Sequence, residues 1–274
     1  MELLKAILFG IVEGITEWIP VSSTGHMILL NEFVKLDVTP EFYEFFEVVI
    51  QLGAILAVVI VLFKRLWPWG FGKTKEETKF TFKLWLLMLI GCIPAGVLGV
   101  LFDDFFEEKM HGPIIVAIAL IVYGIIFILM ETFKYGKRTT KRIEDITVKQ
   151  AGVVGVFQVL SLIPGTSRSG STIIGGLSSG FDRPTIAEFT FLLAIPVMAG
   201  ASLIKFIKYI KNVGLTFTSN ELMILGVGCT VAFLVSMVVI NFFLKYIKKH
   251  DFKIFGYYRI LLGIAVLVYF LVIK

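Results

Sequence analysis

The chain has 274 residues, of which 57% are hydrophobic and only 17% are charged. Soluble globular domains carry about 25% charged residues, so this composition excludes an ordinary soluble protein and indicates an integral membrane protein. The formal net charge of +5 is what Lys and Arg in cytoplasmic loops contribute to a membrane protein, and nucleic-acid binding is not expected.

The first predicted element, residues 1–30, is apolar but interrupted at Pro20 and Gly25. It contains the polar stretch EGITEWIPVSSTGH at 13–26. Broken, polar backbone is tolerated at membrane depth only where protein or a water-filled cavity surrounds it. We therefore predict that 1–30 is a re-entrant loop, which enters the membrane and returns to the side from which it came.

Six further apolar stretches are long enough to cross a bilayer as helices, which takes about 20 residues. Three of them follow the first broken segment. The other three follow a second one, 150–180, which is interrupted at Pro164, Gly165 and Gly170. The six stretches lie at 44–63, 84–102, 112–131, 185–205, 221–243 and 254–273. The sequence thus predicts an all-α polytopic membrane protein, one domain over 1–274, with six transmembrane helices and two re-entrant loops.

The charges of the loops predict how these spans are oriented, because cytoplasmic loops are enriched in Lys and Arg. Loops 64–83 and 132–149 contain six such residues each, and loop 244–253 contains four. We predict that these three loops are cytoplasmic and that the acidic segments 31–43 and 103–111 lie outside. Three basic residues do not fit, because the count of spans places their loop outside: Lys205, Lys208 and Lys211.

This orientation makes the two halves of the chain, 1–131 and 150–274, inverted relative to each other. Two pairs of stretches resemble each other weakly: IPVSSTG (19–25) with IPGTSRS (163–169), and FEVVIQLGAIL (46–56) with AEFTFLLAIPV (187–197). The second pair has one acid in each member, Glu47 or Glu188. Inverted repeats whose broken helices meet at mid-membrane form the substrate site of many transporters, so we expect both broken segments to line one cavity.

Glu13 and Glu17 are four residues apart, so they share one face of a helix. An ionisable group inside a membrane costs about 2.5 kcal/mol or more and usually faces a cavity or a partner. Two neighbouring carboxylates repel each other unless a cation lies between them or one is protonated. Because Mg²⁺ and Ca²⁺ prefer carboxylate oxygen, the pair predicts a divalent-cation site. The alternative is a structural pair that is hydrogen-bonded to neighbouring helices.

Hydroxyl groups follow the acids directly. Ser22, Ser23 and Thr24 are favoured N-cap residues for the helix that follows, and free backbone N–H groups at such a helix start favour an anion. Ser23 is a candidate nucleophile, with His26 as its proton acceptor or donor. The alternative is that the serine only caps the helix and that His26 is an ordinary interfacial histidine.

The second broken segment supplies a cation, Arg168, within IPGTSRSGSTIIGG at 163–176. An unpaired Arg in apolar surroundings is costly and requires an anion, and its planar fork suits phosphate oxygens. Ser167 and Ser169 offer further hydroxyl donors, and Gly165 lets the backbone approach a ligand. The alternative is that Arg168 pairs with an acid of the chain: Glu13, Glu17 or Glu188.

Two acids, a hydroxyl, a histidine and an arginine are the groups that phosphoryl transfer with a metal ion requires. EGITEWIPVSSTGH and PGTSRSG resemble the two signature motifs of undecaprenyl-diphosphate phosphatases, the bacitracin-resistance family, and the resemblance covers essentially the whole chain. It implies removal of one phosphate from undecaprenyl diphosphate at the outer face of the bacterial cytoplasmic membrane. This reaction recycles the lipid carrier for peptidoglycan synthesis and confers bacitracin resistance.

The resemblance also implies residue roles: the acid pair of the family is Glu13 and Glu17, its serine is Ser23, its histidine is His26 and its essential arginine is Arg168. It implies dependence on a divalent cation, Mg²⁺ or Ca²⁺, held by the two acids. We expect the phosphate groups of the substrate to contact Arg168, Ser167, Ser169, Thr24 and Gly165.

Three alternatives stay open at this point. The nucleophile is Ser23, His26 or water. A flippase that returns undecaprenyl phosphate inward would use the same cavity, with Arg168 as a head-group binder. The bilayer and a prenyl diphosphate lipid are the expected partners, and association into a homodimer is left open.

Overall fold

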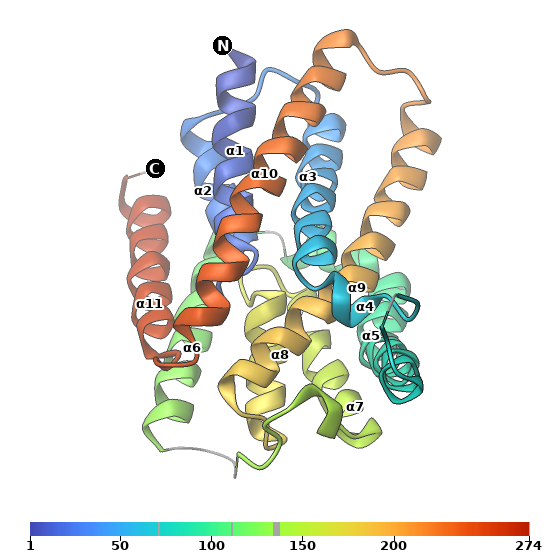
Figure 1. Ribbon diagram of the computed structural model, residues 1–274. Coiled ribbons are helices and arrows are strands. Elements are labelled where there is room, and N and C mark those ends of the chain that lie inside the picture. Colours follow the sequence, from blue (N-terminus) through green and yellow to red (C-terminus); the bar gives the residue numbers. More distant parts are fainter. Residues whose placement is uncertain (71, 111, 134–137, 274) are drawn as a thin grey trace.

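The computed structural model describes residues 1–70, 72–110, 112–133 and 138–273 (Figure 1). Six helices within these ranges are long and apolar enough to cross a membrane. They are α3 (Pro40–Val61), the Lys75–Phe102 part of α5 (Lys75–Met110), α6 (Pro113–Thr132), α9 (Arg183–Asn212), α10 (Ser219–Tyr246) and α11 (Lys253–Val268) with the turn that follows it, to Val272. Short pieces connect or extend them: α4 (Phe63–Leu66), the 3-10 turn Ile143–Asp145 and the π-helical turn Tyr269–Ile273. The prediction of an all-α polytopic membrane protein is confirmed.

Two segments predicted as loops are helical instead. α9 continues to Asn212, so the three lysines predicted on a loop after 205 lie on its last turns. α5 continues past a kink at Phe102 to Met110 and covers most of the predicted acidic loop 103–111. α9 ends two residues before Gly214, which has φ +100°, the left-handed conformation that commonly follows the end of a helix. Of the basic residues in loop 132–149, Lys134 and Lys137 lie outside the described residues.

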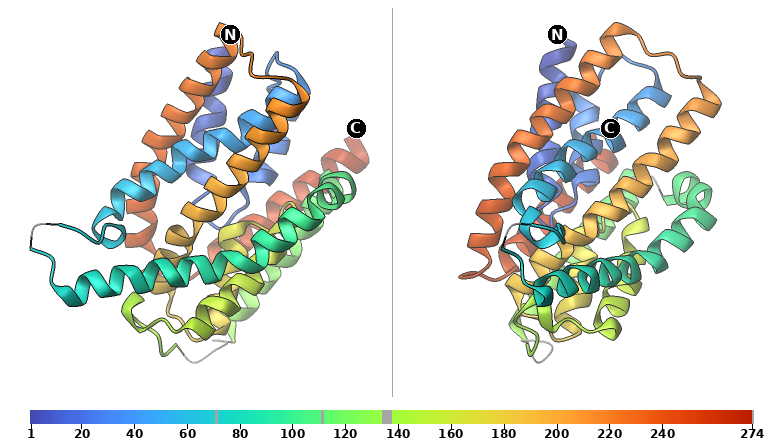
Figure 2. Two further views of the ribbon diagram at one scale, coloured as in Figure 1. Left: turned by 90° about the vertical axis from the view of Figure 1, so that its right-hand side faces the viewer. Right: turned by 45° about the vertical axis from the view of Figure 1, so that its right-hand side comes forward.

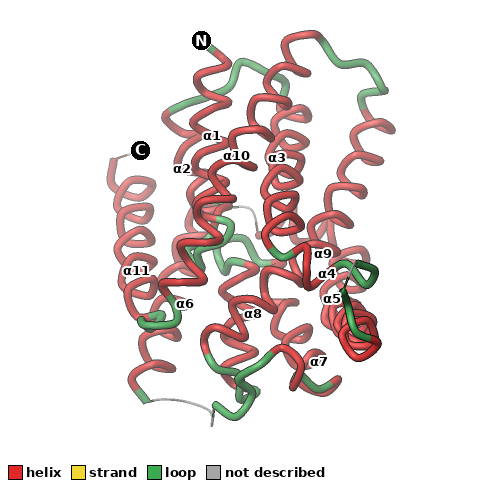
Figure 3. The backbone as a smooth tube through the Cα atoms, viewed as in Figure 1, coloured by secondary structure: helices red, strands yellow, loops and turns green. Residues whose placement is uncertain are grey.

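The two predicted broken segments each form two short helices joined by a turn near mid-height of the bundle (Figure 3). The first consists of α1 (Glu2–Thr16) and α2 (Ser23–Phe33). The second consists of α7 (Val148–Gln158), the 3-10 turn Val159–Leu162 and α8 (Arg168–Ser178). In Figure 1 the first pair comes from the end of the bundle that holds the N-terminus, and the second pair comes from the opposite end. Two re-entrant loops would have this arrangement of helix, turn and helix. How the two segments lie relative to a bilayer stays a prediction.

The breaks do not lie at Gly25 and Gly170, where the sequence placed two of the interruptions. These glycines lie within the first turns of α2 and α8. Ser22 and Ser167 make the breaks, with φ of 74° and 72°. Their hydroxyls accept hydrogen bonds from the N–H groups of Gly25 at 3.3 Å and Gly170 at 3.2 Å. A side-chain oxygen used in this way starts a helix.

These caps correct the predicted alignment of the two motifs by one residue. Ser22 corresponds to Ser167, so Ser23 and Arg168 both stand at the first position of a helix. Behind Arg168, the nine residues 169–177 of α8 are all buried. The second break is therefore enclosed by protein, which is the condition for irregular backbone at membrane depth.

The helices pair in an exchanged pattern. α1 packs on α10 and α7 packs on α5, while α6 packs on α11 and α3 on α9 (Figure 2). Suppose that α1, α3, α5 and α6 correspond, in that order, to α7, α9, α10 and α11. The contact of α1 with α10 then corresponds to the contact of α7 with α5. The contacts of α6 with α11 and of α3 with α9 each correspond to themselves. This exchange is what an inverted repeat requires, and the inverted repeat stays a prediction that the pairing supports.

Glycines allow the first two of these pairs to approach closely. A Cβ atom on Gly10 of α1 would lie 2.7 Å from the carbonyl oxygen of Gly228 of α10. A Cβ atom on Gly155 of α7 would lie 2.6 Å from the carbonyl oxygen of Gly91 of α5. Small residues at such contacts are how membrane helices bring their backbones together.

We expect Gly155→Ala to lower the thermal stability of the detergent-purified protein, because overpacking of a tight contact costs about 1–3 kcal/mol. Gly152 is the matched control on the same helix, since a Cβ atom there would meet nothing within 4 Å. Gly152→Ala should leave the melting temperature unchanged or raise it, because Ala favours a helix over Gly by up to about 1 kcal/mol. Equal shifts for both variants would contradict the close contact of α7 and α5.

Candidate active site

The two breaks bring the first residues of α2 and α8 to the same carboxylate, that of Glu17 at the end of α1. Glu17 is 7% exposed. Its Oε1 forms an ion pair with Arg168 Nη2 at 2.8 Å, and its Oε2 accepts a hydrogen bond from Ser23 Oγ at 2.8 Å. Three of the predicted catalytic residues are thus assembled from two distant segments of the chain.

Arg168 pairs with an acid of the chain, and that acid is Glu17. Its Nη1 also donates to the carbonyl oxygen of Thr190 on α9 at 2.7 Å. Its Nε is buried and has no hydrogen-bond partner in the part of the chain that the structure describes. Glu188, another predicted partner, instead pairs with Arg65 at 3.0 Å, away from this site. A buried donor without a partner is unusual, so Arg168 retains an N–H for a ligand oxygen.

His26 is not paired with Ser23 in this structure, so the expected exchange of a proton between the two stays a prediction. Its Nδ1 lies 2.7 Å from the carbonyl oxygen of Ser22, and its Nε2 lies 2.7 Å from the hydroxyl of Tyr258 on α11. The His26 and Tyr258 rings are stacked, with centroids 5.6 Å apart. Since a carbonyl only accepts, Nδ1 carries a hydrogen. The proton of Ser23 is directed at Glu17 instead.

The other residues predicted to contact phosphate lie around the two turns. Ser167 Oγ is 3.1 Å from Ser169 Oγ, which in turn donates to the backbone oxygen of Glu17 at 3.4 Å. Gly165 has φ +91°, and a Cβ atom there would lie 2.6 Å from a backbone oxygen of α6, so only glycine fits. Thr24 is half-buried in the first turn of α2.

Glu13 lies one turn before Glu17 and is 1% exposed. Its Oε1 is buried and accepts no hydrogen bond from any described residue. Within the described ranges, no three His, Cys, Asp or Glu side chains are grouped so that they alone could hold a metal. Mg²⁺ is usually held by one or two carboxylates, with phosphate and water as the other ligands. The orphaned oxygen of Glu13 therefore fits a cation that is shared with a bound phosphate.

Arg259 of α11 is a site residue that the sequence reasoning missed. It is fully buried, and its Nη1 donates to the carbonyl oxygen of Pro20 in the first break at 3.2 Å. Its Nη2 donates to the carbonyl oxygens of Gly165 at 2.8 Å and Thr166 at 3.0 Å in the second break. One guanidinium thus ties the two breaks together. The signal was present, because a lone arginine within an apolar span indicates a functional site.

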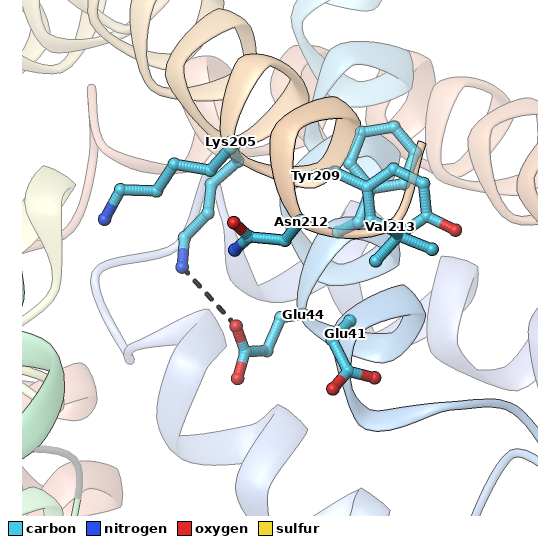
Figure 4. A pocket seen from close by; sticks show the side chains of 8 residues that line it. Glu41, Glu44, Lys205, Tyr209, Asn212 and Val213 are labelled. Atoms are coloured by element: carbon cyan, nitrogen blue, oxygen red, sulfur yellow. Dashed lines mark ion pairs between the residues drawn. The ribbon is translucent and has the colours of Figure 1, made fainter. Parts of the chain in front are cut away.

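A pocket of about 360 Å³ lies elsewhere, between the first turns of α3 and the last turns of α9 (Figure 4). Its charged lining includes Glu44, which forms an ion pair with Lys205 at 3.7 Å. Its other lining residues are Glu41, Phe45, Lys208, Tyr209, Asn212 and Val213. It contains none of the predicted site residues, so the candidate site is defined by the two breaks and not by this pocket.

Comparisons with known proteins agree with the two motifs. A family model described as bacitracin resistance protein BacA matches residues 6–265. The chain is 53% identical over 271 residues to an undecaprenyl-diphosphatase of Enterococcus faecalis, covering 97% of this chain and 96% of the relative. It is 55% identical over 271 residues to undecaprenyl-diphosphatase 1 of Clostridioides difficile, covering 98% and 97%. It is 51% identical over 275 residues to an undecaprenyl-diphosphatase of Acetivibrio thermocellus, covering all of both chains.

Proposed function

Because this chain belongs to the bacitracin resistance protein BacA family, we propose that it hydrolyses undecaprenyl diphosphate to undecaprenyl phosphate and inorganic phosphate. It is a multi-pass membrane enzyme of the undecaprenyl-diphosphatase type. The observation that carries the assignment of residues is the carboxylate of Glu17, which bridges Ser23 and Arg168. This arrangement lets three groups act on one substrate: the hydroxyl of Ser23, the carboxylate of Glu17 as its proton acceptor, and the guanidinium of Arg168 as the phosphate binder.

Ser23 Oγ attacks the terminal phosphorus while its proton passes to Glu17 Oε2, which is already its hydrogen-bond acceptor at 2.8 Å. The bond from Oγ to phosphorus forms, the anhydride P–O bond breaks, and undecaprenyl phosphate leaves. Water then attacks the phosphoserine, and one of its protons stays on the departing phosphate. Ser23 Oγ regains a proton from Glu17, which takes up the other proton of the water and releases it to solvent. Activation of a hydroxyl by an adjacent base is the usual route to such a nucleophile.

Arg168 and the two helix starts stabilise the phosphate groups. The caps of Ser22 and Ser167 occupy the N–H groups of Gly25 and Gly170, so the N–H groups at the first two positions of α2 and α8 have no intrahelical acceptor. Such groups bind anions and act on the charge that develops in the transition state. The residues placed to contact phosphate are Arg168, Ser167, Ser169, Thr24 and Gly165.

A divalent cation, Mg²⁺ or Ca²⁺, belongs to the proposal, with Glu13 and Glu17 as the acids that would hold it. When bound, such an ion neutralises charge on phosphate oxygens. Glu13 is the better-placed acid, because its Oε1 lacks a partner while both oxygens of Glu17 are in use.

We place the reaction at the outer face of the bacterial cytoplasmic membrane, where it would recycle the lipid carrier of peptidoglycan synthesis. The basic loops predict this orientation of the chain. A homodimer also stays a prediction, to be checked by the mass of the purified protein in detergent.

A flippase for undecaprenyl phosphate is less well supported. Such a protein would use Arg168 for the head group but would have no use for a serine hydroxyl directed at a carboxylate. The hydrogen bond from Ser23 to Glu17 therefore favours hydrolysis over transport.

The test is phosphate release from undecaprenyl diphosphate by the purified protein in detergent, with Mg²⁺, Ca²⁺ or a chelator. We expect release by the natural chain that stops with the chelator. Arg168→Ala should lose at least about 99% of the activity, since removal of one oxyanion donor typically costs a factor of about 10²–10³. No release from folded natural chain would overturn the proposal, and unchanged release with the chelator would remove the cation from it.

Tyr258→Phe tests the placement of His26. We expect the rate of phosphate release to fall about three- to tenfold, because one hydrogen bond that orients the ring is worth about 0.5–1.5 kcal/mol. Tyr257→Phe on the same helix is the control, since Tyr257 is 55% exposed and should leave the rate unchanged. If both variants keep the full rate, the contact of Tyr258 with His26 has no part in turnover.

A further inference from the structure

Glu13 differs from Glu17 in that one of its carboxylate oxygens has no hydrogen-bond partner among the described residues. Both oxygens of Glu17 are engaged, with Arg168 and with Ser23. Glu13 is 1% exposed, and the described ranges offer its buried Oε1 no hydrogen-bond partner. An ionisable group at such a place is costly and requires a partner, so something that the chain alone does not supply is expected beside this oxygen.

A second carboxylate faces the same region from α3. The ring of Phe9 on α1 contacts the ring of Tyr43 on α3 edge-on, with centroids 5.8 Å apart. Both helices start at the end of the bundle that holds the N-terminus (Figure 1). One turn further along each helix, on the same face, come Glu13 and Glu47. The two carboxylates are close enough for their charges to interact.

Glu47 is held in place by its own helix. The hydroxyl of Tyr43 donates to Glu47 Oε1 at 2.8 Å. A carboxylate whose direction is fixed in this way is arranged as a ligand, because hydrogen bonds to a ligating carboxylate orient it toward the metal.

We infer that Glu47 of α3 joins Glu13 in binding the divalent cation of this enzyme. The inference rests on the proposed function and changes its ligand set. The sequence paired Glu13 with Glu17, whereas Arg168 already compensates the charge of Glu17. The carboxylates of Glu13 and Glu47 supply hard oxygen ligands, and Mg²⁺ takes one or two carboxylates and completes its shell with phosphate and water. The cation is thus placed between α1 and α3, next to Ser23 and Arg168, and neither of these two residues is a ligand of it.

The competing place for a cation is the surface pocket of Figure 4, where Glu41 and Glu44 are both exposed. Glu41 lies on α3 six residues before Glu47 and lines this pocket. It is therefore the matched control, because its replacement removes one exposed carboxylate from the same helix, whereas the charge of Glu44 acts on Glu47.

The experiment is a titration of the full-length protein in detergent with Mn²⁺, in which electron paramagnetic resonance measures the free ion. We expect Glu47→Gln to weaken Mn²⁺ binding at least about tenfold, as loss of the groups around a metal does. Tyr43→Phe should weaken it less, and Glu41→Gln should leave it unchanged. Equal affinity for natural chain and Glu47→Gln, or a loss in Glu41→Gln alone, would overturn the inference.

Two further arms keep the outcome clear. If Glu47→Gln does not fold, Glu47→Asp retains the charge but draws the carboxylate back, and we expect weaker binding; unchanged binding would count against a ligand role. Phosphate release is measured separately on the same preparations. Release without Mn²⁺ binding would refute this inference and leave the hydrolase standing, whereas binding through Glu47 without release would refute the proposed function.

Discussion

Ser23→Ala is expected to lower the rate of phosphate release at least about a thousandfold, because loss of a nucleophile removes the chemical step that the remaining residues support. Ser23 Oγ is the only hydroxyl described as donating to the side chain of Glu17, at 2.8 Å. Glu17→Gln should be impaired to a similar degree, since an amide keeps the size of the side chain but does not accept the proton of Ser23. The double variant should be no worse than either single variant, because the two residues act as a unit.

The measurement is the steady-state rate of phosphate release at saturating lipid, with size-exclusion profiles to confirm folding. Ser178→Ala is the control, because its hydroxyl bonds to the Ile174 carbonyl oxygen within α8 at 2.8 Å and lies at the far end of that helix. Residual activity of Ser23→Ala above about a tenth of the natural rate would exclude Ser23 as the nucleophile. The alternatives left open above, His26 or water, would then replace it.

Arg259→Gln is expected to reduce both turnover and stability. Three carbonyl oxygens, from Pro20, Gly165 and Thr166, would lose their charged donor. Each buried acceptor left without a donor costs about 1–3 kcal/mol, so the free energy of unfolding should fall by several kcal/mol. Turnover should fall at least about a hundredfold, because a misplacement of about 1 Å at reacting groups costs that much.

Arg259→Lys separates the charge from the geometry. Lysine keeps the positive charge, but its single nitrogen does not reproduce the planar fork that reaches both breaks. We expect a smaller loss of stability than in Arg259→Gln and a comparable loss of turnover. Lys253→Gln, which removes a cation from the start of the same helix, is the control. Full activity in Arg259→Lys would show that charge alone matters at this position and would contradict the tie between the two breaks.

Much of the fold could be predicted because it depends on local pattern. The six apolar stretches match six helices, although α9 and α5 extend beyond the predicted ends. The prolines and hydroxyl-rich stretches correctly mark two broken segments. Pro20, Pro164 and Gly165 lie in the breaks, whereas Gly25 and Gly170 lie within helices. The residues that start the second helix of each pair are Ser22 and Ser167, which have positive φ, and a serine in that conformation has no signal in a single sequence.

The candidate site could be predicted as a set of residues but not as a set of contacts. The sequence by itself determined that two acids, a serine, a histidine and an arginine lie in broken, polar segments of an apolar chain, because burial of such groups in lipid is too costly without a purpose. Only the tertiary structure decided the partners: Arg168 binds Glu17, His26 meets Tyr258, and Arg259 ties both breaks. The physical reason is that hydropathy and helical period depend on neighbours in the chain. The partners of a buried polar group depend instead on how helices distant in sequence are rotated and placed against one another.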